Sequence, residues 1–410
     1  MNLIYSFYIP QTEQLVNLCK VSNNLYNQAL YLFRQALKNE NRWLWYADMD
    51  KLMKTTPNLE EEINYRLLKA QVSQQILKVL DRNVKAYCKA IKDFKAHPAK
   101  YKAMPQLPSF RKRGSLFNLY YPNQSAQIKD GIIRLAKDLK IFIPQWDKYK
   151  ERIQDFQQVR ILPSGKKMKV EIVYRQEVKD ADLDKYKYAS IDLGIDNLAT
   201  MVTEKGSFLY SGKFLKSYNR NFNRQLARLQ SIKDKQGIKK ATKRMQGLYE
   251  KRDRYFEDAF HKYSRMIVNH LIENRIGNLV VGYNTGWKQS VNIGNRNNQK
   301  FVQIPFARLA SCLKYKCRMA GIRFVENEES YTSKCDALAK EEIGKHESYL
   351  GKRVKRGLFR SSTGRYINAD VNGAVNILRK VVGDSDCISQ ITGSGRLLRP
   401  IRYSSPFRVA

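Results

Sequence analysis

The sequence predicts an α+β protein of several domains, in which a small antiparallel β-barrel and a helical module precede an α/β layer. Residues 2–9 are rich in β-branched and aromatic side chains and end at Pro10, which is typical of a short strand. From Thr12 to Lys95 apolar residues recur at helical spacing. From Tyr188 onward short apolar strands alternate with helical segments, which favours an α/β layer.

The barrel is predicted from segments on both sides of the helical module. Residues 131–145 and 157–176 alternate apolar and polar side chains, and Pro163-Ser164-Gly165 indicates a hairpin between two of the strands. With residues 2–9 they could close a small barrel whose first strand is separated from the rest by the helices. We therefore assign residues 1–10 and 100–184 to the barrel and residues 11–99 to the helical module.

The charge of the chain predicts a polyanionic partner. Its 410 residues include 75 Lys and Arg against 38 Asp and Glu, a net charge of +37, while 43% hydrophobic residues are ordinary for a folded protein. Such an excess serves no purpose in an enzyme that acts only on small molecules. Nucleic acid is the favoured partner, although charge alone says nothing about catalysis.

Several basic segments are candidates for contact with nucleic acid. The run Arg111, Lys112 and Arg113, next to Gly114, predicts a loop over phosphates. Lys243 and Arg244 belong to a long basic helical stretch that ends near Arg254. The alternative for any such stretch is an ordinary solvated surface.

The cysteines and the start of the chain indicate a reducing, intracellular compartment. Six cysteines are scattered without CxxC pairs, and residues 1–6 lack a basic segment followed by a long apolar run. The sequence contains no stretch of about 18 uncharged apolar residues, so we expect no membrane span and a cytoplasmic protein.

Two aspartates are candidates for metal-assisted chemistry. Two divalent ions can neutralise the attacking and leaving oxygens of a phosphodiester, and such ions need carboxylate ligands from distant parts of a chain. Asp192 lies in an otherwise apolar strand, where a charge is costly unless it is paired or bound to metal. Asp370 begins a predicted helix. Taken alone, Asp192 could be a turn residue before Gly194, and Asp370 a helix N-terminal acid.

Four segments carry a resemblance to a known family. They are SIDLGIDNLAT (190–200), VVGYNTGWKQ (280–289), SYTSK (330–334) and GRYINADVNGAVNIL (364–378). They occur in the order found in TnpB-type RNA-guided DNA endonucleases, the transposon-associated OrfB family related to the type V CRISPR effectors. The chain resembles this family in detail over residues 185–380 and only in layout before them.

The resemblance implies a fold and an activity. Residues 185–331 and 366–383 would form a RuvC-like nuclease domain with an RNase H fold, with Asp192 as the first catalytic carboxylate and Asp370 as the last. The barrel would be the wedge domain and the helices the recognition module. The implied partners are a guide RNA made from the transposon end and double-stranded target DNA read beside a short motif. The implied cofactor is Mg²⁺, with Mn²⁺ as an alternative, and both a monomer and a dimer fit the sequence.

The second catalytic residue departs from the commoner family pattern. Many relatives have a glutamate at the end of the VVxE strand, where this chain has Gly282. Some family members are nuclease-dead repressors that bind DNA through their guide RNA, and a lost ligand would suit them. In others the glutamate has moved to the strand before the YTS motif. We favour Glu329, with Glu328 as second choice, because in a strand Glu329 would share a face with Tyr331 and only one of the two glutamates could reach the metals.

The insertion at residues 332–365 departs as well. Many relatives carry a zinc ribbon there, but this chain keeps only Cys335 and His346, with Asp336 as a weak substitute, so we expect no structural zinc. The degenerate insertion instead holds a basic run that could contact a nucleic-acid backbone or be a solvated charge run. It consists of Lys352, Arg353, Lys355, Arg356 and Arg360.

Two further segments complete the predictions. Trp287 and Lys288 follow the strand that ends at Gly282 and are candidates to stack on or contact a nucleotide. Residues 384–410 predict a flexible basic tail. Three functions remain open from the sequence: an RNA-guided endonuclease, a guided repressor without cleavage, and a transposase that joins strands without a guide.

Overall fold

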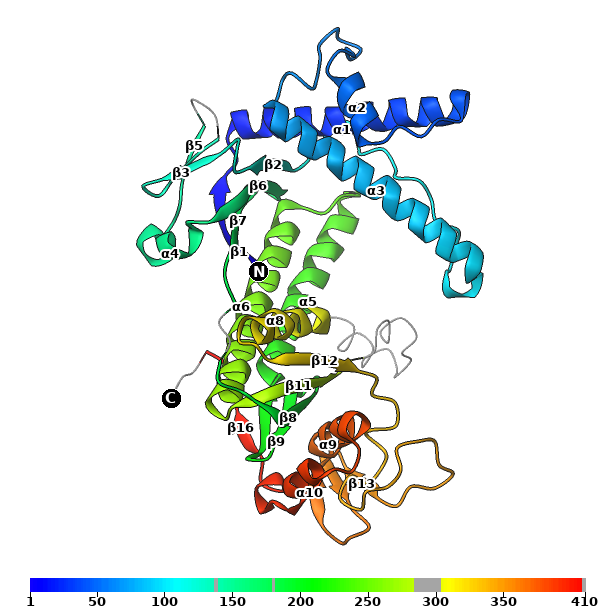
Figure 1. Cartoon of the computed structure of the whole chain (residues 1–410), viewed down its shortest axis with the longest axis vertical. Helices are drawn as coiled ribbons and strands as arrows, with labels where there is room; N and C mark the ends of the chain where they lie inside the picture. Colours follow the sequence, from blue (N-terminus) through cyan, green and yellow to red (C-terminus); the bar gives the residue numbers. More distant parts are fainter. Residues whose placement is uncertain (136–138, 179–180, 284–303, 408–410) are drawn as a thin grey trace. The chain divides into compact units, whose positions relative to one another are not determined.

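The computed structural model describes residues 1–135, 139–178, 181–283 and 304–407, which belong to two compact units, Met1–Glu177 and Val178–Ala410 (Figure 1). The second unit begins before Asp184, where a boundary was expected. The reason is that Ala181 already donates its backbone N–H to Ala320 of the second unit. Among the described residues, none of the helices combines the length and the apolar character that crossing a bilayer requires.

The first unit contains an antiparallel sheet that joins the chain start to residues far along the sequence. Its strand order is β1-β7-β6-β2, and β1 pairs with β7 from Asn2 opposite Arg175 to Pro10 opposite Lys167. The predicted hairpin connects β6 to β7, with its turn at Gly165, whose φ is +57°. A second antiparallel sheet has the order β3-β4-β5. The bounds in this unit are β1 (Asn2–Pro10), β2 (Leu119–Pro122), β3 (Gln127–Lys129), β4 (Ile132–Arg134), β5 (Lys140–Phe142), β6 (Phe156–Ser164) and β7 (Lys167–Arg175).

The helices of the first unit lie in sequence between β1 and β2, except for α4. The Thr12 hydroxyl caps α1 by accepting from the Leu15 N–H. Apolar side chains at helical spacing face a core shared with the first sheet, such as Leu30 on α1 and Ile76 on α3. The bounds are α1 (Glu13–Glu40), α2 (Tyr46–Met53), α3 (Ala70–Ala96), the 3₁₀ turn η1 (Pro98–Lys100) and α4 (Trp146–Ile153).

The second unit is built on a six-stranded sheet in the order β12-β11-β8-β9-β10-β16. Strands β8, β9 and β10 follow one another antiparallel, and β11 and β12 then run parallel to β8. The carboxyl ends of β8, β11 and β12 therefore meet at one edge, where ligand sites of such sheets usually form. The bounds are β8 (Asp184–Asp192), β9 (Asn197–Thr203), β10 (Gly206–Ser211), β11 (Ile276–Gly282), β12 (Arg323–Asn327) and β16 (Ile401–Tyr403).

Helices cover both faces of this sheet. The faces alternate along β8, so Ile191 packs into the core with α6 and α8, while its neighbour Ser190 faces α9. Figure 1 shows α6 and α8 on one side of the sheet and α9 on the other. A small sheet of order β13-β14-β15 precedes α9. The bounds are α5 (Lys213–Lys235), α6 (Lys243–Glu273), α8 (Phe306–Met319), β13 (Lys352–Lys355), β14 (Leu358–Arg360), β15 (Tyr366–Asn368) and α9 (Ala369–Val382).

The C-terminal residues are not the flexible tail that the sequence predicted. They form α10 (Asp386–Gly393), the 3₁₀ turn η3 (Gly395–Leu397) and β16, which pairs parallel to β10. The apolar side chains of Ile388, Ile391 and Leu397 are fully buried in the core beneath α9. Their burial offsets the conformational entropy that is lost when the segment becomes ordered. The basic composition of the segment gave no sign of these buried residues.

Candidate active site

Asp192 and Asp370 come together because α9 packs on the end of β8. Asp192 is the last residue of β8, and Asp370 lies in the first turn of α9. The Ser190 hydroxyl donates to the Ala374 carbonyl oxygen at 2.6 Å, which holds the helix on the strand. A Cβ at Gly373 would lie 2.9 Å from Asp192 Oδ2, so only glycine lets the helix approach this closely.

The start of α9 is set by Asn368. Its side-chain oxygen accepts from the backbone N–H groups of Asp370 and Val371, at 3.0 and 3.3 Å. This N-cap fixes where the helix begins and hence which residue occupies its first turn. The Asp370 side chain is also close to a cation, since Arg353 Nη2 lies 4.0 Å from its Oδ1.

Glu329 reaches the end of β11. A Cβ on Gly282 would lie 2.9 Å from Glu329 Oε2 and 2.4 Å from Ile377 Cδ1. The carboxylate of Glu329 therefore occupies space that a side chain at position 282 would need. Gly282 is thus the neighbour of the glutamate we selected.

Glu328 points elsewhere. Its side chain is exposed, and Lys380 Nζ donates to its Oε2 at 2.8 Å. Lys380 and the Ser330 side chain are the main causes of a lowered pKa for this carboxylate. Glu328 is therefore held in its ionised form away from Asp192.

The structure corrects the reason for choosing between the two glutamates. We expected a strand that continues through Tyr331, but β12 ends at Asn327. The chain then turns, because the Thr332 N–H and hydroxyl both donate to the Glu329 carbonyl and Tyr331 adopts a φ of +67°. Strand alternation therefore does not apply at these residues, and the direction of Glu329 is decided by this turn.

The electrostatics of the three carboxylates oppose full ionisation. Burial raises the pKa of Asp192 well above its usual range, and the negative charges of Asp370 and Glu329 raise it further. Burial, followed by the charge of Glu328, raises the pKa of Glu329 to about 7. A cation at this place would relieve both effects. As the side chains stand, however, the described part of the chain contains no group of three or more His, Cys, Asp or Glu residues arranged to hold a metal ion.

Two neutral residues beside the carboxylates were missed by the sequence argument. Asn197 Nδ2 donates to Asp370 Oδ2 at 2.7 Å. Thr200 pairs with Asp192 across β8 and β9, so their side chains share a face, and its buried hydroxyl has no hydrogen-bond partner among the described residues. Both lie within the SIDLGIDNLAT segment, but neither carries a charge that would draw attention to it.

Helix α9 also holds the segment that follows Glu329. Asn372 accepts from the Ala337 N–H at 3.0 Å and donates to the Cys335 carbonyl at 2.8 Å. Asn376 donates to the Thr332 and Cys335 carbonyls at 2.9 and 2.7 Å. These buried amides satisfy backbone groups of the turn, so their role in the structure is to fix that segment against α9.

Asp336 organises the insertion through hydrogen bonds. Its two oxygens accept from the N–H groups of Leu338, Ala339 and Ser362 and from the hydroxyls of Ser361 and Ser362, at 2.7 to 3.3 Å. Asp336 is fully buried, and an ion bound to it would have to compete with these five donors. Cys335 Sγ instead contacts the Gly344 carbonyl, and His346 contacts the Glu342 carbonyl. Because hydrogen-bond donors already occupy both oxygens of Asp336, this carboxylate does not fit the role of a zinc ligand.

We predict that Asp336→Ala lowers the free energy of unfolding of the protein by about 3 kcal/mol, because buried donors lose their acceptor. Urea denaturation would measure this change, with Asp386→Ala, an exposed aspartate on α10, as the control. Treating the wild type with a zinc chelator should leave its denaturation midpoint unchanged. A midpoint that falls with the chelator would show that a metal holds the insertion after all.

The predicted nucleic-acid contacts are mostly exposed cations. Arg111 is the exception, since its Nε donates to Asn23 Oδ1 at 3.1 Å and its guanidinium lies over the Phe117 ring. Arg356 pairs with Asp196, and Arg353 lies near Asp370, so the β13–β14 hairpin brings cations to the carboxylates. Trp287 and Lys288 lie outside the described residues. The exposed remainder comprises Lys112, Arg113, Lys243, Arg244, Lys352 and Lys355.

Comparisons with known proteins agree with the motifs. Residues 171–288 match a family model described as a probable transposase, and residues 306–377 match the model of the Cas12f1-like TNB domain. The TnpB-like protein ORF457 of Acidianus two-tailed virus is 28% identical over 237 residues, which are 55% of this chain and 49% of that protein. The CRISPR-associated endodeoxyribonuclease Cas12f2 of a Micrarchaeota archaeon is 29% identical over 139 residues, 32% of this chain and 25% of the relative. The chain thus spans half or less of the length of these curated relatives.

One solved structure shares the fold over most of its length. It is Cas12f1, determined in a complex with single-guide RNA and target DNA, with a TM-score of 0.56, 15% identity, and coverage of 89% of this chain and 82% of the Cas12f1 chain. At this identity the likeness concerns the fold alone. The family models and the TnpB-like relative confirm the resemblance that the motifs indicated.

Proposed function

We propose that this chain, which resembles TnpB-type proteins in sequence and Cas12f1 in fold, is an RNA-guided DNA endonuclease. The observation that carries the proposal is the approach of Asp192, Asp370 and Glu329 from three separate parts of the chain. Like charges collected at a buried place are costly unless a cation or proton compensates them. The sheet of order β12-β11-β8-β9-β10 would be the core of the RuvC-like nuclease domain.

Asp192, Glu329 and Asp370 would hold Mg²⁺, or Mn²⁺ as an alternative. When bound, two such ions activate water and stabilise the leaving oxygen of a phosphodiester. The donor set suits Mg²⁺, which keeps several waters and takes few protein oxygens, so carboxylates that do not yet converge on one point can still be its ligands. Asn197 would hold Asp370 in place through its 2.7 Å hydrogen bond.

The partners we propose are a guide RNA derived from the transposon end and a double-stranded target DNA. The net charge of +37 and the exposed cations of the β13–β14 hairpin would bind their backbones. Base pairing would read the target, while the wedge and recognition elements, β1–β7 and α1–α3, would read a short adjacent motif. Such a protein would act at chromosomal DNA in the cytoplasm.

Cleavage of a plasmid library with randomised flanks tests the proposal directly. The protein would be purified with coexpressed guide RNA and assayed in Mg²⁺. Asp192→Ala and Glu329→Ala should lower the cleavage rate by at least about 10³-fold, because each removes a ligand of the activating ions. Glu328→Ala, the matched control on the neighbouring residue, should cleave like the wild type.

The same assay separates the rival functions. Guided binding of the target without cleavage by the wild type would make the chain a nuclease-dead repressor. The glycine at position 282 is the sequence feature that favours this function. Strand joining without any guide RNA would make it a transposase. Equal loss of cleavage in Glu328→Ala and Glu329→Ala would reject our choice of glutamate.

The space at Gly282 provides a second prediction. Gly282→Ala should reduce cleavage at least about tenfold and lower stability, because its Cβ would meet both Glu329 and Ile377. Adding Ile377→Val removes the nearest methyl group and should restore much of the melting temperature. Cleavage should stay low in the double variant, since the conflict with the Glu329 carboxylate persists. Full recovery of cleavage would mean that position 282 affects packing only.

The buried hydroxyl of Thr200 provides a third prediction. We expect it to donate to the Asp192 carboxylate when that group is ionised in the working enzyme. Thr200→Val keeps the side-chain shape and should slow cleavage about tenfold or more, because a hydrogen bond to a charged group is worth about 1.5–3 kcal/mol. It should also raise the Mg²⁺ concentration needed for half-maximal rate, whereas Thr200→Ser should behave like the wild type. Unchanged rates for Thr200→Val would show that the hydroxyl is idle.

A further inference from the structure

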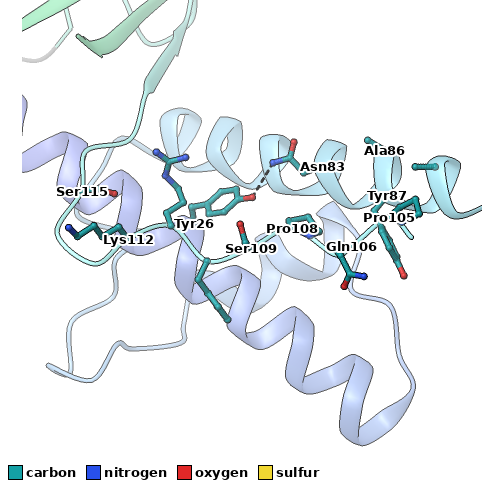
Figure 2. Close-up of a pocket in the computed structure, with 13 residues that line it drawn as sticks. Tyr26, Asn83, Ala86, Tyr87, Pro105, Gln106, Pro108, Ser109, Lys112 and Ser115 are labelled. Atoms are coloured by element: carbon teal, nitrogen blue, oxygen red, sulfur yellow. Dashed lines mark hydrogen bonds between the residues drawn. The ribbon is translucent and has the colours of Figure 1, made fainter. Parts of the chain in front are cut away.

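The first unit contains a pocket that shares no residue with the candidate active site. It is an open hollow lined by α1, α3 and the segment 105–115, and its volume is about 750 Å³, within the range of small-molecule sites. Figure 2 shows Tyr87 and Gln106 at one end and Lys112 at the other, with Tyr26 and Asn83 between them. All of these side chains belong to the same unit.

The wall of this pocket is held in place by hydrogen bonds. Asn27 donates to the Arg111 carbonyl at 2.9 Å and accepts from its N–H at 2.8 Å. Asn23 donates to the Lys112 carbonyl at 3.2 Å, and Arg34 Nη2 donates to the Pro108 carbonyl at 2.6 Å. A preformed wall lowers the entropy that binding a ligand would cost.

The lining combines two kinds of chemistry. Tyr87 and Phe110 contribute aromatic rings, and Phe110 is 47% exposed, while Tyr26 is only 4% exposed and lines the pocket from the core. Lys112 contributes an exposed cation, whereas the Arg111 guanidinium is engaged by Asn23 and Phe117, and the described residues of the lining include no carboxylate. Aromatic rings beside a cation, without acidic groups, suit a flat base attached to a phosphate.

The polar groups at the centre add base selectivity. Asn83 Nδ2 donates to the Tyr26 hydroxyl oxygen at 3.0 Å, the bond drawn in Figure 2. This bond directs the Tyr26 hydroxyl hydrogen and the Asn83 Oδ1 toward other partners. A hydroxyl donor beside an amide acceptor matches an edge with a ring nitrogen next to an exocyclic amine, as in cytosine and adenine, but not uracil.

We infer that this pocket binds one unpaired nucleotide of a single-stranded nucleic acid, with cytosine or adenine preferred. The base stacks on Tyr87, its edge meets Tyr26 and Asn83, and Lys112, at the opposite end of the pocket, meets a backbone phosphate of an adjoining nucleotide. The inference rests on the proposed function, because it takes the nucleic acid from the guide RNA or from a displaced DNA strand. Both sources present the same base and phosphate.

Binding of fluorescent octanucleotides to the full-length protein tests the inference. The oligonucleotides would be rC8, rA8, rU8 and dC8, in a buffer with EDTA so that metal and cleavage play no part. The wild type should bind rC8 and rA8 more tightly than rU8. Tyr26→Phe should remove that preference, because it removes the donor while keeping the ring.

Aromatic substitutions test the stacking contact. Tyr87→Ala should weaken rC8 binding about tenfold, in keeping with the stacking energy of one base. Tyr31→Ala is the matched control, since Tyr31 is an exposed tyrosine on α1 that does not line the pocket. Tighter binding of rC8 than dC8 would identify RNA as the source, and the reverse order would identify DNA.

Two results would overturn the inference. One is equal affinity of Tyr87→Ala and the wild type for every octanucleotide; the other is a base preference that survives Tyr26→Phe. Either result leaves the proposed endonuclease intact, because guided cleavage is measured separately in Mg²⁺. Conversely, a wild type that does not cleave under guidance would contradict the proposed endonuclease. It would leave a base preference measured in EDTA, and with it the pocket inference, unaffected.

Discussion

The packing of α9 against the end of β8 is the contact on which the candidate site depends. It brings Asp370 beside Asp192, although 177 intervening residues separate them in the sequence. The absence of a side chain at Gly373 and the hydrogen bond from Ser190 to Ala374 make this approach close enough for the two charges to influence each other. Elements that lie far apart in the chain thereby contribute to one electrostatic environment.

The same helix governs the third carboxylate indirectly. Asn376 holds the Thr332 carbonyl, and Thr332 in turn donates to the Glu329 carbonyl. Ile377, one residue further along α9, leaves no room for a side chain at position 282. A single helix therefore supplies one acidic residue, fixes the turn that carries another and limits what can stand on β11.

Charge is balanced locally rather than over the whole chain. The protein carries a large positive excess, yet Asp192, Glu329 and Asp370 approach one another, and burial raises the pKa values of Asp192 and Glu329. Arg353 opposes this rise at Asp192 and lies near Asp370. In the insertion, backbone and hydroxyl donors surround the buried carboxylate of Asp336.

The sequence by itself determined the elements that depend on neighbouring residues. The strands around Asp192, the helix that begins near Asp370 and the helices before β2 were all predicted, because apolar periodicity and capping residues act over a few positions. The family resemblance was likewise carried by short contiguous motifs, and the comparisons confirmed it.

Only the tertiary structure decided which groups meet. The alternation argument assumed that the strand continues past Glu329, but β12 ends at Asn327. The direction of the Glu329 side chain comes instead from a turn that is bonded to α9. Thr200 and Asn197 carry no charge, so their place beside the aspartates follows from strand pairing and a hydrogen bond across the fold. The basic C-terminal segment joins the sheet because its few apolar residues find a core made by residues far away in the chain. Such partners are long-range contacts, which a local pattern does not encode.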